Sequence, residues 1–199
     1  MNSTDSRDVI NRGKIIVFSA PSGAGKTTLL SYLRLSISGL VYSISATTRS
    51  PRPGERHGEH YFFLSEQEFR KKIEEGGFAE WEMVHGNYYG TPRSFLDETV
   101  ARGTHVIMDI DVFGKKKFDP VYPEALGILI LPPDLGELEK RLRARQTETE
   151  ETIERRMTNA SIEMNYAICE GKYEYRIIND DLERAQEEVL QIVRKIIEQ

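Results

Sequence analysis

The sequence predicts an α/β fold in which helices cover both faces of a parallel β-sheet. Short apolar runs rich in β-branched residues, typical of buried parallel strands, alternate along the chain with helical patterns. The chain of 199 residues is also long enough for one such core with appendages. The predicted strands span residues 14–19, 39–45, 104–109, 125–131 and 173–178.

The predicted helices carry apolar residues at intervals of three and four, which places them on one buried face. Each helix can therefore pack one apolar stripe against the sheet. These stripes are Leu29, Leu30, Leu33 and Ile37; then Leu135, Leu138 and Leu142; then Ile153, Met157, Ala160, Met164 and Ala167; and finally Leu182, Ala185, Val189, Val193 and Ile196.

Residues 46–94 interrupt this alternation. They are rich in Tyr, Arg, Gly and His, and the run "HYFFL" at residues 60–64 predicts a strand. A helix should follow, because Ser65 and Glu68 have the spacing of a capping box, and a pair of glycines at 76–77 ends the helical pattern. The segment therefore predicts a small α+β unit.

The domain organisation follows from this interruption. We expect a core domain built from residues 1–45 and 95–199, with an inserted domain over residues 46–94. A second unusual segment, "RARQTETEETIERR" at about 143–156, has almost no apolar residues and should contribute little to a core. We expect it to form a mobile lid.

Composition limits the kinds of partner. The formal net charge is −5 with both signs interspersed, so no basic surface for nucleic acid or membrane is indicated. A single cysteine, Cys169, excludes an internal disulfide framework and suits a reducing compartment. The N-terminus lacks the apolar core of a signal peptide, and no apolar run reaches membrane-spanning length. We expect a cytoplasmic protein with small-molecule partners and no obligate protein partner.

The stretch "APSGAGKTT" predicts a phosphate-binding P-loop, although Ala20 stands where the usual pattern has glycine. It follows a predicted strand and leads into a helix, which disfavours the alternative of a Gly-Ser turn with a solvated lysine. Gly23 and Gly25 permit turns that aim backbone amides at an anion. Lys26 would reach the terminal phosphates of a nucleotide, and the Thr27 hydroxyl would ligate Mg²⁺. The predicted nucleotide-binding residues are Ala20, Pro21, Ser22, Gly23, Ala24, Gly25, Lys26, Thr27 and Thr28.

The run "VIMDID" predicts a second part of the same site. A buried strand that ends in an acidic residue is typical of P-loop enzymes, which place a carboxylate near Mg²⁺ in this way. Asp109 is the candidate for that role, and Asp111 should project nearby. Asp111 could also cap the following helix, and the two roles are compatible.

A second anion site is predicted in "TTRSPRPGERHGEHYFF". Arg49 and Arg52 lie three residues apart in a segment stiffened by prolines, so both guanidinium groups can be held on one anion at limited entropic cost. A phosphate monoester is the obvious ligand, and the hydroxyls of Tyr61 and Tyr89 could donate to it. The alternative is a pair of solvated surface arginines, which the surrounding prolines and aromatic residues disfavour.

Taken together, these motifs resemble the guanylate kinase family, whose members transfer the terminal phosphoryl group of ATP to GMP. The resemblance covers nearly the whole chain. It is carried, in order, by "FSAPSGAGKTT", "SATTRSPRPGERHGEHYFF", "FAEWEMVHGNYYGT", "VIMDIDVFG", "ILPPDLGELEKRLRARQTETEETIERRM" and "IINDDL". It implies a P-loop NTPase-type parallel sheet, an inserted GMP-binding domain over 46–94, and a lid. Ala-Pro-Ser-Gly is also familiar in this family, so Ala20 is tolerated.

The resemblance implies roles for individual residues. It places Ser45, Glu80, Thr91 and Asp111 at the guanine base, and Arg49, Arg52, Tyr61 and Tyr89 at the GMP phosphate. Asp109 is expected beside GMP and, with Thr27, at Mg²⁺. Lys26 and Arg49 are expected to act in catalysis with the arginines around the ATP phosphates, which are Arg141, Arg145 and Arg156. Relatives often have Arg-Gly where this chain has Arg145-Gln146, which leaves the bend of the lid open.

The chemistry of guanine agrees with these roles. Guanine presents N–H donors beside the O6 acceptor, so Glu80 complements the donors while Ser45 or Thr91 donates to O6. Adenine would leave buried groups unpaired, which can support discrimination of ~10⁴. Thr91 has an alternative role as the N-cap of a helix beginning at Pro92.

We expect no general base, because the nucleophile is already an anionic phosphate oxygen. On helical geometry, Arg141 and Arg145 share a face and could pair with the phosphates or with the glutamates of "TETEE". Alternatives to the kinase are a catalytically silent binding module, a related kinase for a phosphorylated sugar, and a generic P-loop nucleotidase. The intact P-loop, the guanine-reading set and the Arg/Tyr clamp, respectively, argue against them.

Overall fold

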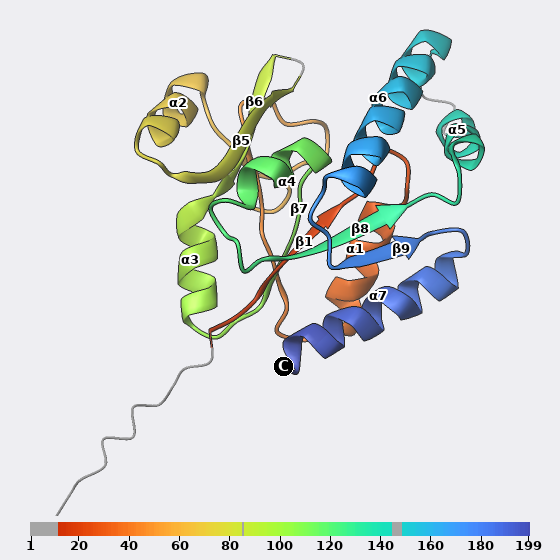
Figure 1. Ribbon diagram of the computed structural model, residues 1–199. Helices are drawn as coiled ribbons and strands as arrows, with labels where there is room; N and C mark the ends of the chain where they lie inside the picture. Colours follow the sequence, from red (N-terminus) through yellow and green to blue (C-terminus); the bar gives the residue numbers. More distant parts are fainter. Residues whose placement is uncertain (1–11, 85, 145–148) are drawn as a thin grey trace, which may run out of the picture.

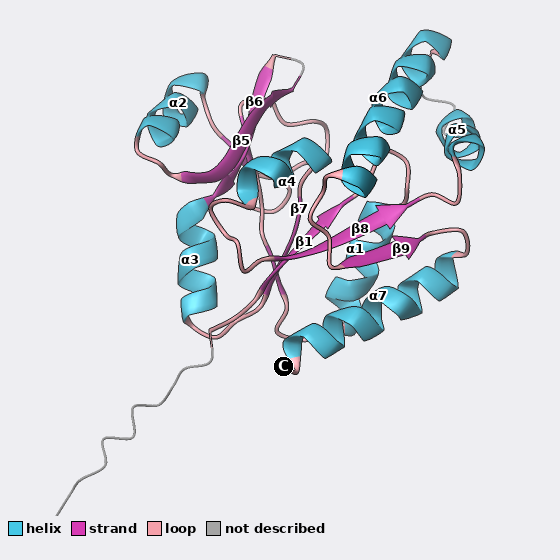
Figure 2. Ribbon diagram, in the orientation of Figure 1, coloured by secondary structure: helices cyan, strands magenta, loops and turns pink. Residues whose placement is uncertain are grey.

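The computed structural model describes residues 12–84, 86–144 and 149–199, and two β-sheets form its framework (Figures 1 and 2). The larger sheet is parallel, with strand order β2-β7-β1-β8-β9. Its strands are β1 (Ile15–Ser19), β2 (Val41–Tyr42), β7 (Val106–Asp109), β8 (Leu126–Leu131) and β9 (Tyr175–Ile178). The predicted α/β fold class is therefore confirmed.

Helices cover both faces of this sheet, as the alternation of buried residues along β1 shows. Ile16 and Phe18 point to one face, where they pack with α1 (Lys26–Ser36) and α7 (Leu182–Ile197). Val17 points to the opposite face and joins residues of α3 (Arg93–Ala101) and α4 (Val112–Phe118). Both faces of the central strand are thus buried, which explains its continuous apolar run.

The helices α5 (Leu135–Ala144) and α6 (Glu150–Cys169) pack against each other through Leu138, Leu142 and Ala160. Within the described part of residues 143–156, Ile153 on α6 is a buried apolar residue, as its place on the predicted apolar stripe requires. Arg145 and Gln146 lie outside the described residues, and the mobility of the lid stays a prediction. Neither α6 nor any other helix in the described ranges has the length and apolar character needed to cross a membrane.

The smaller sheet has strand order β4-β3-β6-β5 and lies beside the larger one (Figure 2). Its strands are β3 (Ala46–Thr47), β4 (Phe62–Phe63), β5 (Phe78–Val84) and β6 (Asn87–Pro92). The predicted capping box is present at the start of α2 (Glu66–Glu74), where Ser65 and Glu68 satisfy each other's backbone N–H groups. The hairpin β5–β6 was not predicted, because β5 lacks a regular alternation of buried and exposed residues.

Two predicted elements in the core end early. The strand predicted over 39–45 is reduced to Val41–Tyr42, because the chain leaves the large sheet there and enters the small sheet at Ala46. The first helix ends at Ser36, since Ile37 adopts an extended conformation with φ −126°. The early exit of the chain carries residues 43–45 from one sheet toward the other.

Phe69 anchors the small sheet, and its removal should destabilise the protein. Its ring is fully buried and stacks on Phe78 and Tyr88 with centroid distances of 4.3 and 5.2 Å. We expect Phe69→Ala to lower the free energy of unfolding by about 3–5 kcal/mol, measured by denaturant titration. Leu35→Ala is the control, because Leu35 is 89% exposed and its loss should change stability by less than about 0.5 kcal/mol. Equal effects of the two substitutions would contradict the role of Phe69.

Candidate nucleotide-binding site

The loop between β1 and α1 is fixed in the shape expected of a phosphate cradle. Gly23 and Gly25 have φ values of 98° and 95°, which residues with a Cβ atom rarely adopt. A Cβ atom on Gly25 would also lie 2.2 Å from Nδ2 of Asn179. That amide donates to the carbonyl oxygen of Ala24 at 2.8 Å and so ties the loop to the end of β9. Asn179 was not assigned a role from the sequence.

The predicted nucleotide-binding residues surround a cavity of about 360 Å³ at the start of α1. All of the predicted loop residues line it except Ala24, which is buried beneath the loop with its carbonyl engaged by Asn179. Asp109 and Asp111 line the same cavity, as predicted. Glu163 on α6 completes the lining. Burial and the nearby charge of Asp111 raise the pKa of Glu163 to about 7. No local motif marks this residue in the sequence.

Lys26 and Asp109 both line this cavity and form an ion pair, with 2.6 Å between Nζ and Oδ2. The hydroxyl of Tyr42 donates to the other oxygen of the same carboxylate. Burial by itself would raise the pKa of Asp109, but the charge of Lys26 and the two hydrogen bonds outweigh it and lower the pKa. Asp109 is therefore held as a carboxylate beside the loop. Tyr42 was missed because nothing in its local sequence indicates this contact.

Asp111 caps the start of α4, which is one of the two roles predicted for it. Its Oδ1 accepts a hydrogen bond from the Gly114 N–H at 2.7 Å, at the start of α4. The capping interpretation is confirmed, and the side chain still borders the nucleotide cavity.

A second cavity of about 400 Å³ lies between the two sheets. Its core side is lined by four residues that also line the first cavity, namely Lys26, Thr27, Asp109 and Asp111. The predicted base and phosphate residues that line it from the other side are Ser45, Tyr61, Glu80 and Tyr89. The structure therefore brings together residues that are far apart in the chain.

Glu80 is a buried carboxyl group in the wall of this second cavity, with 9% of its surface exposed. Its pKa is raised to about 7, mainly by burial and further by the charge of Asp111, although the Thr91 hydrogen bond opposes this shift. The Thr91 hydroxyl donates to Oε1 at 2.7 Å. Thr91 does not cap α3, where Pro92 is the N-cap residue and no side chain caps the helix, so the capping alternative for Thr91 is wrong.

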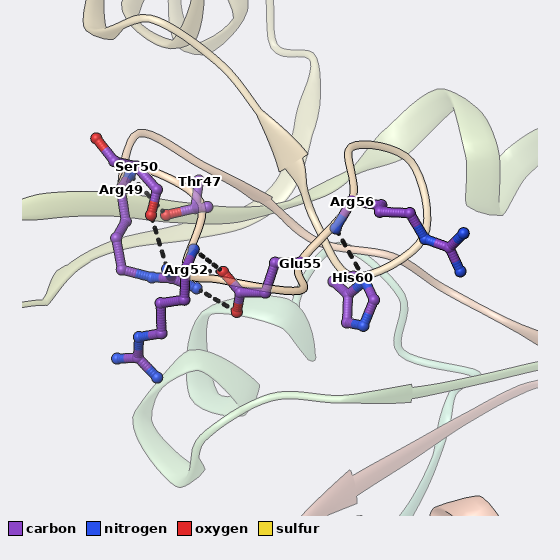
Figure 3. Close-up of polar contacts among 7 residues, drawn as sticks. All are labelled: Thr47, Arg49, Ser50, Arg52, Glu55, Arg56 and His60. Atoms are coloured by element: carbon purple, nitrogen blue, oxygen red, sulfur yellow. Dashed lines mark hydrogen bonds and ion pairs between the residues drawn. The ribbon is translucent and has the colours of Figure 1, made fainter.

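Arg49 lies close to both predicted tyrosines. Its Cζ atom is 5.4 Å from the ring centroid of Tyr61, and the Tyr61 and Tyr89 rings meet edge-on at 6.0 Å. The guanidinium group of Arg49 also binds both carboxylate oxygens of Glu55 (Figure 3). Arg52 is exposed, and its guanidinium group extends away from that pair, so the structure does not bring the two arginines onto one point.

The three arginines predicted near the ATP phosphates have different surroundings. Arg141 donates to Oε1 of Glu137 at 3.1 Å and to the carbonyl oxygen of Asn179 at 2.9 Å. Arg156 borders a cavity of about 560 Å³ that also includes Ser22 and Glu163. Arg145 lies outside the described residues. Among the described residues, Arg143 contacts Glu150 of the "TETEE" segment, whereas the ion pair of Arg141 is with Glu137.

Comparisons with known proteins agree with this arrangement. A protein-family model described as "Guanylate kinase" matches residues 12–196. The guanylate kinase of Caldanaerobacter subterraneus subsp. tengcongensis is 46% identical over 182 residues, which cover 92% of this chain and 87% of the relative. The guanylate kinase of Myxococcus xanthus is 46% identical over 189 residues, with coverages of 95% and 90%.

A solved structure is also similar. The crystal structure of guanylate kinase from Anaplasma phagocytophilum matches with a TM-score of 0.72 and 30% sequence identity, over 95% of this chain and 88% of that chain. The family model, the relatives and the fold lead to the same conclusion: this chain belongs to the guanylate kinase family.

Proposed function

We propose that the cavity between the sheets binds GMP and that the P-loop cavity binds the phosphates of ATP. The overall activity is that of the family: ATP:GMP phosphotransfer, which yields ADP and GDP. One observation carries the assignment of the two substrates to the two cavities. Lys26, Thr27, Asp109 and Asp111 line both of them, so a phosphate in one cavity would face a phosphate in the other across Lys26.

Glu80 would recognise the guanine base. Its carboxylate can accept hydrogen bonds from N1–H and N2–H₂, whereas adenine would place a lone pair against it. The Thr91 hydroxyl already donates to Glu80, so Thr91 would orient this carboxylate. Ser45, which borders the same cavity, is then the better candidate to donate to O6. Asp111 would complete the base site from the core.

Arg49, Arg52, Tyr61 and Tyr89 would hold the phosphate of GMP. Arg49 is next to both tyrosines, as a joint phosphate site requires. Arg52 would have to turn toward the cavity when the ligand binds. We propose that this turn accompanies closure of the inserted domain, residues 46–94, over the core of residues 1–45 and 95–199.

The residues present fit a magnesium ion that is shared with ATP. The Thr27 hydroxyl and the Asp109 carboxylate supply the oxygen ligands that Mg²⁺ prefers, and both line the P-loop cavity. No group of three or more His, Cys, Asp or Glu side chains within the described ranges could hold a metal ion alone. This agrees with a metal bound by one or two side chains and the substrate phosphates. When bound, Mg²⁺ would neutralise charge on the ATP phosphates.

Catalysis would depend on alignment and charge neutralisation, without a general base. Lys26, Arg49, Arg141, Arg145 and Arg156 would neutralise the transferring phosphoryl group. The segment at 143–156 would act as a lid that excludes water when ATP binds. We further propose a cytoplasmic location, where ATP and GMP are available, and activity that needs no protein partner.

Acceptor specificity tests the proposed function. ADP formation should be measured with ATP and Mg²⁺, with GMP, AMP, UMP, dTMP or ribose phosphates as the acceptor. Selective turnover with GMP is expected. Turnover with a sugar phosphate would assign the enzyme to a related kinase. Binding of GMP without turnover of any acceptor would favour the binding-module alternative.

Lys26 should be needed for turnover but not for GMP binding. Lys26→Ala removes the ammonium group placed between the two cavities, so we expect kcat to fall by at least about 10²–10³-fold. The dissociation constant for GMP, measured by calorimetry, should change little. Lys140→Ala is the control, because Lys140 is 80% exposed on α5. If both variants kept full turnover, the role of Lys26 would be wrong.

Glu80→Gln should affect GMP far more than ATP. The amide cannot accept both N–H groups of guanine, so the KM for GMP should rise by roughly 10–100-fold while the KM for ATP stays constant. Steady-state kinetics with each substrate varied in turn would measure this difference. An equal rise in both KM values would argue against a role for Glu80 in reading the base.

The same substitution should stabilise the ligand-free protein at high pH. Because the folded-state pKa of Glu80 is raised from 4.5 to about 7, the folded protein binds more protons than the unfolded chain between these values, and stability is lost as the pH rises through that window. The amide of the variant does not ionise, so Glu80→Gln should gain at most about 3 kcal/mol at pH 8 and almost nothing at pH 4.5. Thermal unfolding at both pH values would measure the difference. A gain that does not depend on pH would exclude this explanation.

A further inference from the structure

We propose that Glu55 is a positioning residue that holds Arg49 ready for the phosphate of GMP. This inference rests on the proposed role of Arg49 in the phosphate clamp. Glu55 has no role in that clamp as described above, and it would not touch the substrate itself.

Glu55 binds Arg49 through two parallel hydrogen bonds. Nη1 donates to Oε2 and Nη2 donates to Oε1, both at 2.9 Å (Figure 3). Nη1 also donates to the carbonyl oxygen of Ser50 at 2.8 Å. The two side chains are only 16% and 17% exposed, so this pair is much less accessible to solvent than the pair of Arg56 and Glu59 in the same loop. A bidentate pair of this kind fixes the plane of a guanidinium group.

A turn in the backbone fixes Glu55 in its own place. The Glu55 N–H donates to the carbonyl oxygen of Arg52 at 3.0 Å, and Gly54 has φ 86°, as the third residue of a type II turn requires. The Arg52 N–H donates back to the Glu55 carboxylate at 2.7 Å. Arg49 and Arg52 together lower the pKa of Glu55 to about 2, so the group is charged at neutral pH. The sequence "RPGE" thus builds a rigid acceptor six residues after Arg49.

The geometry favours positioning over competition with the ligand. A guanidinium group offers two edges with paired donors. Glu55 takes the edge formed by Nη1 and Nη2, and it does not use the edge formed by Nε and Nη2. A phosphate can therefore approach that second edge without displacing Glu55. The rings of Tyr61 and Phe63 lie 5.4 and 5.8 Å from Cζ and further limit the positions of the arginine.

Arg52 provides a contrast within the same loop. Its backbone is held by Glu55, but its guanidinium group is exposed and directed away (Figure 3). The clamp would then consist of one arginine that is positioned before the ligand arrives and one that closes afterwards. Ordering Arg49 in advance lowers the entropic cost of binding, because a long side chain loses its rotamer freedom during folding instead.

The inference is tested with Glu55→Gln, which keeps the shape of the side chain but loses the charge and one acceptor. We expect the dissociation constant for GMP to rise by about 3- to 10-fold, with the KM for ATP unchanged. The affinity for guanosine, which lacks the phosphate, should also stay constant. Glu59→Gln is the matched control, because Glu59 lies on the same loop and pairs with Arg56 at the surface. It should alter none of these values.

A double-mutant cycle separates positioning from a general structural effect. If Glu55 acts through Arg49, adding Glu55→Gln to Arg49→Lys should weaken GMP binding little beyond the single Arg49→Lys change. Tighter GMP binding by Glu55→Gln would show that Glu55 competes with phosphate, and equal losses for GMP and guanosine would show a merely structural role. Either result overturns the inference, as does unchanged GMP binding. The proposed clamp fails separately, if Arg49→Lys leaves GMP binding intact.

Discussion

The ion pair between Lys26 and Asp109 is the contact on which the arrangement of the site depends. It exists because β1 and β7 are parallel neighbours, with Phe18 paired in register with Asp109. Lys26 is the first residue of α1, directly after the loop that follows β1, and Asp109 ends β7, so both reach the carboxyl edge of the sheet. The two cavities share this edge. Any shift in register between these strands would separate the cation from the carboxylate and divide the shared wall.

The protein pairs several cations of the proposed phosphate sites with its own carboxylates. Lys26 binds Asp109, Arg49 binds Glu55, and Arg141 binds Glu137. These contacts keep partly buried positive charges from being left without a counter-ion. They differ in what an incoming phosphate would meet. A phosphate that approached Lys26 would also meet the Asp109 carboxylate, which is proposed to share Mg²⁺. A phosphate that approached Arg49 could bind the edge formed by Nε and Nη2 while Glu55 stayed bound to the edge formed by Nη1 and Nη2.

Two acidic side chains line the cavities, and their burial affects both the stability of the protein and the binding of a ligand. Glu80 and Glu163 both have pKa values raised to about 7, chiefly by burial, although each lies in a site proposed for a nucleotide. Burial makes a carboxylate costly to ionise, and hydrogen bonds that it accepts from a ligand would offset that cost. Glu80 already has such a donor in Thr91, which orients its carboxylate.

Local patterns in the chain were enough to predict the fold class, the P-loop, the capped helix of the small unit and the carboxylate at the end of β7. These features depend on apolar periodicity, glycine placement and the spacing of motifs, all of which can be read from neighbouring residues. Ser45 and Glu80 at the second cavity were expected only from the resemblance to the guanylate kinase family. The three-dimensional arrangement was needed to show that Tyr42, Glu163 and Asn179 belong to the site, and that Thr91 pairs with Glu80 instead of capping a helix. Such contacts join residues brought together by strand order and helix packing, and no local pattern encodes a partner that is distant in the chain.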